Sequence, residues 1–208
     1  MSLTFGNKRI YLASRSPRRR ELLAQIGVNF ELLLLREDPA RGADVDESLV
    51  SGEDPRAYVL RVSHDKAETG WLRAQQRRLP HYPVLAADTA VVLGDRIMGK
   101  PANREEAVEM LLALSGRTHQ VLTAVAVTNG GRVEQRLSVT SVRFCELTEL
   151  VVRRYVMSGE PLDKAGAYGI QGHAAAFIEK IEGSYSGVMG LPLYETAALL
   201  ADFGLEVL

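Results

Sequence analysis

Short apolar segments typical of β-strands alternate along this chain with longer segments that have the periodicity of helices. Strand-like segments at residues 10–13, 30–35 and 84–93 are separated by helix-like segments at 17–26 and 55–78. This alternation constrains the fold more than any other feature, because it favours an α/β class in which strands and helices pack as layers. The chain of 208 residues is long enough to bury a large core without disulfides.

The second half of the chain continues this pattern, with a hairpin in its middle. Asn129-Gly130-Gly131 is a strong turn signal between two strand-like segments, 120–128 and 133–144. The other elements expected here are helices at 105–114, 147–157 and 192–203 and a late strand at 175–183. The sequence has no repeat, low-complexity tract or linker. We therefore predict one domain over residues 1–208, folded as two lobes around a cleft.

Charge and composition argue against several classes of protein. The 25 basic and 26 acidic residues nearly cancel, whereas nucleic-acid binding needs a broad basic surface. No apolar run approaches the ~18 residues of a membrane span, and the first residues lack the apolar core of a signal peptide. Cys145 is the one cysteine, so an intrachain disulfide is excluded and we expect a buried side chain. The expectation is a cytoplasmic protein with no nucleic-acid or membrane partner.

The segment ASRSPRRRELL at residues 13–23 places three arginines at a predicted helix start. Ser16 is positioned to cap this helix, with Pro17 in its first turn. Positive side chains are unfavourable near the positive end of a helix dipole unless a ligand brings negative charge. Backbone N–H groups at a helix start and arginine guanidinium groups both bind phosphate. We interpret Arg18 to Arg20, with the hydroxyls of Ser14 and Ser16, as a phosphate site; solvated surface arginines are the alternative.

Asp88 lies within the apolar segment 84–93, where a charged residue is unfavourable unless it is paired, hydrogen-bonded or metal-bound. A carboxylate there can act as general base toward a water molecule or as a Mg²⁺ ligand. The alternative is an aspartate at a strand end that caps the adjacent turn. Thr89 would point to the opposite face of the strand, or into the same site if the strand has a bulge at Asp88.

Lysines and one glutamine provide further candidate contacts with a ligand. Lys100 lies between a glycine and a proline, and its compact positive charge can contact a triphosphate. Lys66 and Lys164 are weaker candidates, because most lysines are surface residues. Gly169 and Gly172, the two glycines of AYGIQG at residues 167–172, would let the backbone pass close to a ligand. The amide of Gln171 between them could read a base edge. An ordinary glycine-rich turn is the alternative.

Several common site patterns are absent from the sequence. There is no phosphate-binding GxxxxGK[ST] loop, no GxGxxG fingerprint, no GxSxG elbow and no zinc spacing. The histidines are scattered, and we expect each to be structural or on the surface: His64, His81, His119 and His173. The residues alone thus indicate an α/β protein with a phosphate site and a carboxylate on a central strand, suited to nucleotide or phosphoester chemistry.

Four longer segments, in this order, resemble the Maf family of nucleoside triphosphate pyrophosphatases: LASRSPRRRELL, AADTAVVLGDRIMGKP, LSGRTHQVLTAVAV and DKAGAYGIQGHAAAFIEKIEGSYSGVMGLPLYET. The resemblance extends from about Ile10 to Phe203. It implies a Maf/ITPase-like mixed α/β sheet with helices, in which two lobes flank a deep cleft. It also implies cleavage between the α and β phosphates, giving a monophosphate and pyrophosphate, with a divalent cation (Mg²⁺ or Mn²⁺). The family suggests a homodimer.

The resemblance also implies roles for individual residues. Asp88 would be the proton acceptor that activates water, with Arg19, Lys66 and Lys100 among the cations along the phosphates. Asp88 would also bind the metal, together with an acid from the long acidic loop at residues 36–55.

Among the acids of this loop, Glu47 is preferred over Asp46 and Glu37.

Three positions indicate which branch of the family the chain resembles. The branch that acts on dTTP and UTP has arginine after Ser-Pro, threonine after the catalytic aspartate and glutamine in the IQG segment. This chain has Arg18, Thr89 and Gln171 there, whereas a branch that acts on 7-methyl-GTP has tryptophan, glutamine and glutamate. The Gln171 amide matches the O4 and N3–H edge that uracil and thymine share. Because one methyl group is discriminated by only ~1–3 kcal/mol, both nucleotides would be accepted.

The expected role is therefore to hydrolyse dTTP, UTP and modified pyrimidine nucleotides, a house-cleaning of nucleotide pools with a link to cell division arrest. The alternative is a non-catalytic nucleotide-binding regulator of septum formation, which would have no evident use for a catalytic base.

Overall fold

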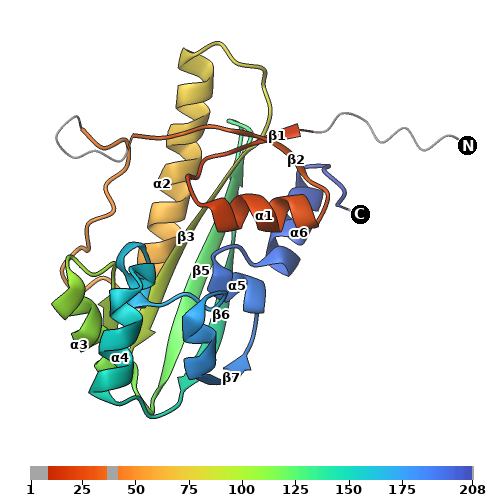
Figure 1. Cartoon of the computed structure of the whole chain (residues 1–208). Helices are drawn as coiled ribbons and strands as arrows, with labels where there is room; N and C mark the ends of the chain where they lie inside the picture. The colour runs from red at the N-terminus through yellow and green to blue at the C-terminus, as the bar shows by residue number, and fades with distance from the viewer. Residues whose placement is uncertain (1–8, 37–41, 208) are drawn as a thin grey trace, which may run out of the picture.

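The computed structural model describes residues 9–36 and 42–207, and it confirms the mixed α/β class (Figure 1). Within these residues the sheet has seven strands in the order β2-β1-β3-β5-β6-β7, with β4 paired to β3. β1 is parallel to both of its neighbours, and the other pairs are antiparallel. The strands are β1 (Arg9–Leu12), β2 (Asn29–Leu32), β3 (Val84–Leu93), β4 (Arg96–Met98), β5 (Thr118–Thr128), β6 (Val133–Phe144) and β7 (Ile178–Glu182).

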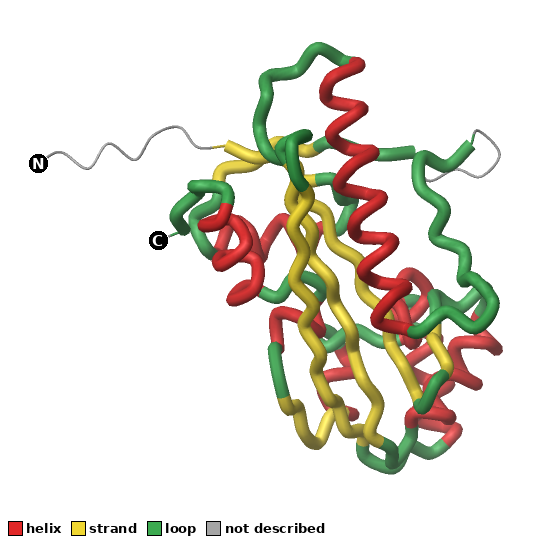
Figure 2. The backbone as a smooth tube through the Cα atoms, turned by 180° about the vertical axis from the view of Figure 1, so that it is seen from behind, coloured by secondary structure: helices red, strands yellow, loops and turns green. Residues whose placement is uncertain are grey.

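The helices connect these strands and cover the two faces of the sheet. They are α1 (Pro17–Gln25), α2 (Pro55–Gln76), α3 (Arg104–Leu114), α4 (Glu149–Met157), α5 (Tyr185–Met189) and α6 (Leu193–Asp202). Three short 3₁₀ helices lie in the segment between α4 and β7: η2 (Glu160–Asp163), η3 (Ala165–Ala167) and η4 (His173–Phe177). α2 runs along the long strands, as the view from behind shows (Figure 2).

β1, α1 and β2 form a parallel βαβ unit. The predicted helix start is confirmed, because Pro17 is the first helical residue and Ser16 Oγ accepts a hydrogen bond from the Arg19 N–H at 3.4 Å. Gly27, with φ of +71°, adopts the left-handed conformation that commonly follows a helix end. β2 is shorter than the predicted strand at 30–35, because its partner β1 ends at Leu12, the residue paired with Leu32.

Side chains of the central strand β3 alternate between hydrophobic clusters on the two faces of the sheet. Even-numbered apolar residues from Val84 to Val92 pack with α2, whereas odd-numbered apolar residues pack with the helices of the other face. The ladder with β5 continues without a shift through Asp88 and Thr89. Asp88 therefore faces α2 and Thr89 faces the opposite side, so the interpretation of Asp88 as a strand-end cap is wrong.

One edge of β3 has a gap between two short neighbouring strands. β1 pairs with β3 only at Val84 and Leu85, and β4 pairs with it only from Val91 onward. Residues 86–90 therefore lack a strand neighbour on this edge within the described part of the chain, while β5 pairs with all of them on the other edge. A ligand at this gap can reach side chains on both faces of the sheet.

The structure also bears on the expectations about Cys145 and about membrane-spanning segments. Cys145, expected to be buried, is partly exposed. It follows the end of β6, where its N–H donates to the Phe177 carbonyl at 2.8 Å and its own carbonyl accepts from the Gly116 N–H at 2.9 Å. No helix in the described ranges is long and apolar enough to cross a membrane. The deep cleft between two lobes stays a prediction.

Buried His119 predicts a loss of stability in acid. Its ring packs edge-to-face against Phe144 and Tyr168 and lies 2.8 Å from the Tyr168 hydroxyl. Burial lowers the pKa of His119 from 6.5 to about 4. The unfolded chain therefore takes up this proton first, and stability falls as the pH drops from about 6.5 to about 4. The full effect is about 3 kcal/mol.

Urea unfolding between pH 7 and pH 4.5 measures this effect. We expect His119→Phe to lack this component, so that its stability falls less than that of the wild type, since other acid-labile groups contribute equally to both. The exposed His81 supplies the control, and His81→Phe should keep the wild-type profile. Parallel profiles for His119→Phe and the wild type would contradict the prediction.

Candidate active site

Lys66, on α2, lies between two carboxylates at the gap in β3. Its Nζ donates to Asp88 Oδ1 at 2.8 Å and lies 3.1 Å from Glu47 Oε1. The Lys66 and Asp88 side chains are 14% and 10% exposed, whereas Glu47 is 44% exposed. The ammonium therefore offsets the charge of the buried Asp88 and joins the acidic loop to the central strand.

The residues around Lys66 are suited to a divalent cation that is also bound by a substrate. No set of three or more His, Cys, Asp or Glu side chains in the described ranges is placed to hold a metal. Mg²⁺, however, commonly takes one or two carboxylates together with waters and substrate phosphates. Asp88 and Glu47 match that donor set, and a positive group already lies between them.

The structure distinguishes between the acids of the loop at residues 36–55 that are candidates for binding the metal. Glu47 lies beside Lys66, whereas Asp46 Oδ1 accepts a hydrogen bond from the Ser48 N–H at 2.9 Å and caps its own turn. Glu37 lies outside the described residues. Glu47 is thus the loop acid that contacts Lys66, and its role as a metal ligand stays a prediction.

At the start of α1, Arg19 makes hydrogen bonds within the chain. Its Nε donates to the Gly190 carbonyl at 2.7 Å, its Nη1 to Ser14 Oγ at 3.3 Å and its Nη2 to Thr89 Oγ1 at 3.3 Å. Ser14 Oγ also accepts from the Ser16 N–H at 3.2 Å. These contacts bring the predicted residues Ser14, Ser16, Arg19 and Thr89 together on the face of β3 opposite Asp88.

Thr123, on β5, extends this contact network and was missed by the sequence analysis. Its Oγ1 lies 3.0 Å from Thr89 Oγ1 and 2.8 Å from the Gly187 carbonyl oxygen. A hydroxyl has one hydrogen and a carbonyl can only accept, so Thr123 donates to Gly187 and Thr89 donates to Thr123. Thr89 therefore has a defined orientation. The signal was available, because Thr123 is a polar residue within an apolar strand.

Within the described residues, no hydrogen bond joins the rest of this site to three predicted side chains: Arg18, Lys100 and Gln171. Lys100 and Gln171 are exposed, and Arg18 is half-buried. Burial raises the pKa of Asp163, but the hydrogen bond from Lys164 and the charges of Lys164 and Arg18 hold it below its ordinary value. Arg18 therefore lies close enough to the 3₁₀ segment to influence its electrostatics.

Glu160 holds the segment that carries Gln171. Its Oε1 accepts from the Tyr155 hydroxyl at 2.9 Å, and its Oε2 accepts from the His173 N–H at 3.0 Å. A Cβ added at Gly172 would overlap the Glu160 carboxylate. The glycine thus serves a close approach within the chain, and the approach of a ligand expected from the sequence stays a prediction. No local sequence pattern indicated Glu160.

A separate cavity of about 370 Å³ lies between β4 and α3, lined by Arg96, Met98, Asn103, Glu105, Glu106, Glu109, Met110 and Ala113. None of the predicted site residues lines it. The candidate active site is therefore the gap at residues 86–90 of β3, with α1 on one face of the sheet and α2 on the other.

Known proteins resemble this chain over nearly its whole length. The sequence model of the Maf family, described as Maf-like protein, matches residues 9–203. A relative from Nitrosomonas europaea named dTTP/UTP pyrophosphatase is 58% identical over 95% of this chain and 96% of its own length. A relative of the same name from Chromobacterium violaceum is 51% identical over 99% of this chain and 100% of its own length.

Among solved structures, a HAM1 protein from Coxiella burnetii has the same fold, with a TM-score of 0.52 and 16% identity over 93% of this chain and 98% of its own. The matched family model and the near-full-length relatives show that the chain belongs to the Maf family.

Proposed function

We propose that this protein hydrolyses dTTP and UTP to the nucleoside monophosphate and pyrophosphate. The observation that carries the proposal is that near-full-length relatives, at 51% and 58% identity, are named for this activity. Arg18, Thr89 and Gln171 are the residues expected of that branch. The geometry adds a buried carboxylate beside a lysine, at a strand edge next to an arginine-rich helix start.

Asp88 is the proposed general base. Its carboxylate is fixed by Lys66 at 2.8 Å and lies on the α2 side of the sheet beside the gap in β3, where a water molecule within ~3 Å could lose a proton to it. Arg18, Arg19 and Lys100 would supply the positive charge that favours departure of pyrophosphate. Asp88 and Glu47 would hold Mg²⁺ or Mn²⁺ against the phosphates, and the cation would offset the charge of the triphosphate.

Incubation with each common nucleoside triphosphate in ¹⁸O-labelled water, with Mg²⁺, tests the reaction. We expect dTTP and UTP to give pyrophosphate and a labelled monophosphate, because water attacks the α-phosphorus. Orthophosphate release, or label in the pyrophosphate, would contradict the proposal. Binding without turnover would favour the alternative, a non-catalytic nucleotide-binding regulator of septum formation. Removing metal with EDTA and restoring it tests the divalent cation.

Modified pyrimidine nucleotides are proposed as further substrates, and kcat/KM measured across them would rank them against dTTP and UTP. A homodimer, a cytoplasmic location and a link to cell division stay predictions.

Gly172→Ala tests whether the segment held by Glu160 sets selectivity. The added Cβ would overlap the Glu160 carboxylate. The carboxylate must therefore shift, which disturbs its hydrogen bond to the His173 N–H and the segment that carries Gln171. We expect kcat/KM for dTTP and UTP to fall about 10- to 100-fold, as displacements near 1 Å do, with a smaller change for purine nucleotides. Steady-state kinetics with the nucleotide panel measure this.

Gly131→Ala is the matched control, because its Cβ would have only an ordinary contact, 3.5 Å from Asn129 Oδ1. Equal losses for every nucleotide in Gly172→Ala would show that the segment does not contribute to base selection.

A further inference from the structure

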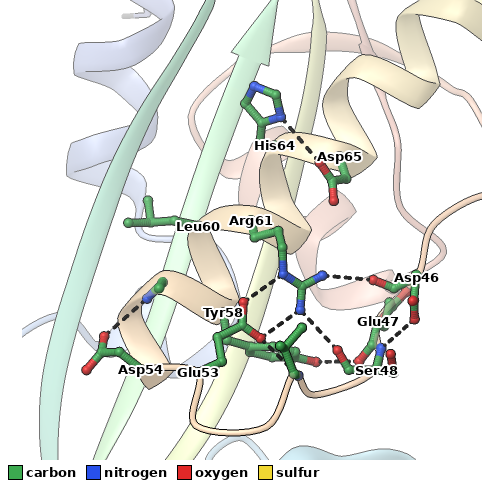
Figure 3. A network of polar contacts seen from close by, with 12 residues as sticks. Asp46, Glu47, Ser48, Glu53, Asp54, Tyr58, Leu60, Arg61, His64 and Asp65 are labelled. Carbon is green, nitrogen blue, oxygen red and sulfur yellow. Dashed lines mark hydrogen bonds and ion pairs between the residues drawn. The ribbon is translucent and has the colours of Figure 1, made fainter.

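The loop that carries Glu47 is ordered by side chains of α2. Three consecutive carbonyls of the loop, at residues 46, 47 and 48, each accept a hydrogen bond from α2 (Figure 3). Arg61 Nη1 donates to the Asp46 carbonyl at 3.1 Å and Nη2 to the Ser48 carbonyl at 3.0 Å, while the Tyr58 hydroxyl donates to the Glu47 carbonyl at 3.1 Å. The backbone on both sides of Glu47 is therefore fixed by one guanidinium.

Glu53 fixes that guanidinium in turn. Arg61 Nε donates to Glu53 Oε1 at 2.7 Å and Nη2 to Glu53 Oε2 at 2.8 Å, and Glu53 Oε2 also accepts from the Val50 N–H at 3.3 Å. Four of the five N–H donors of Arg61 are thus engaged with a single loop. The Arg61 side chain is 30% exposed and Glu53 only 11%, so solvent weakens this pair less than a fully exposed one.

Apolar packing contributes little to the shape of the loop at this point. Leu49 and Val50 are 55% and 59% exposed, so burial of these side chains does not define the loop conformation. The polar contacts to α2 must supply that definition. The position of the Glu47 carboxylate therefore depends on Arg61.

The same helix also carries Lys66, which contacts both Glu47 and Asp88. Burial, together with the negative charges of Asp88 and Glu47, raises the pKa of Tyr58 to about 12, which agrees with its place beside both carboxylates. α2 is thus one rigid element that sets the loop acid against the central-strand acid.

We propose that Arg61, held by Glu53, is a positioning residue that sets the Glu47 carboxylate for binding a divalent cation with Asp88. This rests on the proposed function, in which those two carboxylates hold the metal. Arg61 itself would not touch the cation or the substrate. Its guanidinium fork matters here, because the three donors of a lysine ammonium cannot span two carbonyls and a carboxylate in the same plane.

Mn²⁺ binding tests this without turnover. Free Mn²⁺ is measured by its EPR signal in titrations of the whole protein with the non-hydrolysable α,β-imido-dUTP. We expect Arg61→Met and Arg61→Lys to weaken Mn²⁺ binding about 10- to 100-fold, the range for groups that orient metal ligands. Tyr58→Phe, which removes one hydrogen bond, should weaken it about fivefold and covers the case that an Arg61 variant does not fold.

A double-mutant cycle with Glu47→Gln shows whether Arg61 acts through Glu47. If it does, Arg61→Met adds little to the loss in Glu47→Gln, whereas independent residues give additive losses. Arg56→Met is the matched control and should bind Mn²⁺ as the wild type does. Arg56 is an exposed arginine of the same helix, and its side chain makes no hydrogen bond or ion pair with the residues that the structure describes.

Four results would overturn the inference: wild-type affinity in Arg61→Met and Tyr58→Phe, wild-type affinity in Arg61→Lys, additive losses in the cycle, or no Mn²⁺ binding by the wild-type protein. The proposed function is decided separately, by hydrolysis of dTTP and UTP by the wild-type protein. Failure of the inference about Arg61 can therefore be distinguished from failure of the proposed function.

Discussion

Replacing Asp88 with Asn is expected to lower kcat for dTTP about 10³-fold or more, the range lost when a general base is removed. Nucleotide binding should change only a few-fold, because the amide keeps the shape of the carboxylate and its oxygen can still accept the hydrogen bond that Lys66 now makes at 2.8 Å. Pyrophosphate release measures kcat, and calorimetry with α,β-imido-dUTP measures binding.

Asp95→Asn is the control for this substitution, since Asp95 is an exposed residue of the turn between β3 and β4. Unchanged turnover in Asp88→Asn would place the base elsewhere. Loss of nucleotide binding with unchanged kcat would instead show that Asp88 holds the substrate and does not activate water.

Replacing Lys66 with Met is expected to lower kcat/KM for dTTP and UTP about 10²- to 10³-fold. The ammonium lies 2.8 Å from Asp88 Oδ1 and 3.1 Å from Glu47 Oε1, and its loss leaves two carboxylates without the cation between them. A partly buried charge that loses its partner is strongly destabilised. Both carboxylates should reorient, and a proposed phosphate contact is lost as well.

Steady-state kinetics of Lys66→Met give kcat and KM separately, and we expect both to change. Lys180→Met is the matched control, because Lys180 is an exposed lysine of β7 that pairs with Glu182. In a double variant, Lys66→Met should add less to Asp88→Asn than it costs alone, since the two residues are in direct contact. Full additivity would mean that Lys66 acts on the phosphates alone.

Local sequence signals predicted most of the elements correctly, because their causes are local. The cap at Ser16, the first-turn Pro17 and the turn at residues 129–131 each act within a few residues. The extent of β2 was predicted less well, since a strand ends where its partner ends and that partner is distant in the sequence.

The residues of the candidate site likewise differ in whether local sequence signals predict them. Asp88 was predictable, because a carboxylate within an apolar strand needs a reason to be there. Arg61 was not, since nothing in the pattern of α2 distinguishes it from the solvent-exposed Arg56. Glu160 could not be predicted either, because its hydrogen-bond partners are Tyr155 and, 13 residues after it, His173, and no local spacing marks these contacts.

The sequence by itself determined the α/β class, the arginine-rich helix start and the acid at position 88. Only the tertiary structure decided that Asp88 and Thr89 face opposite sides of β3, and that both lie where β3 has no strand neighbour between β1 and β4 within the described residues. It also decided that Glu47 is the loop acid beside Lys66. The physical reason is that strand pairing and contacts between distant side chains depend on which segments meet in space, and spacing along the chain does not record this.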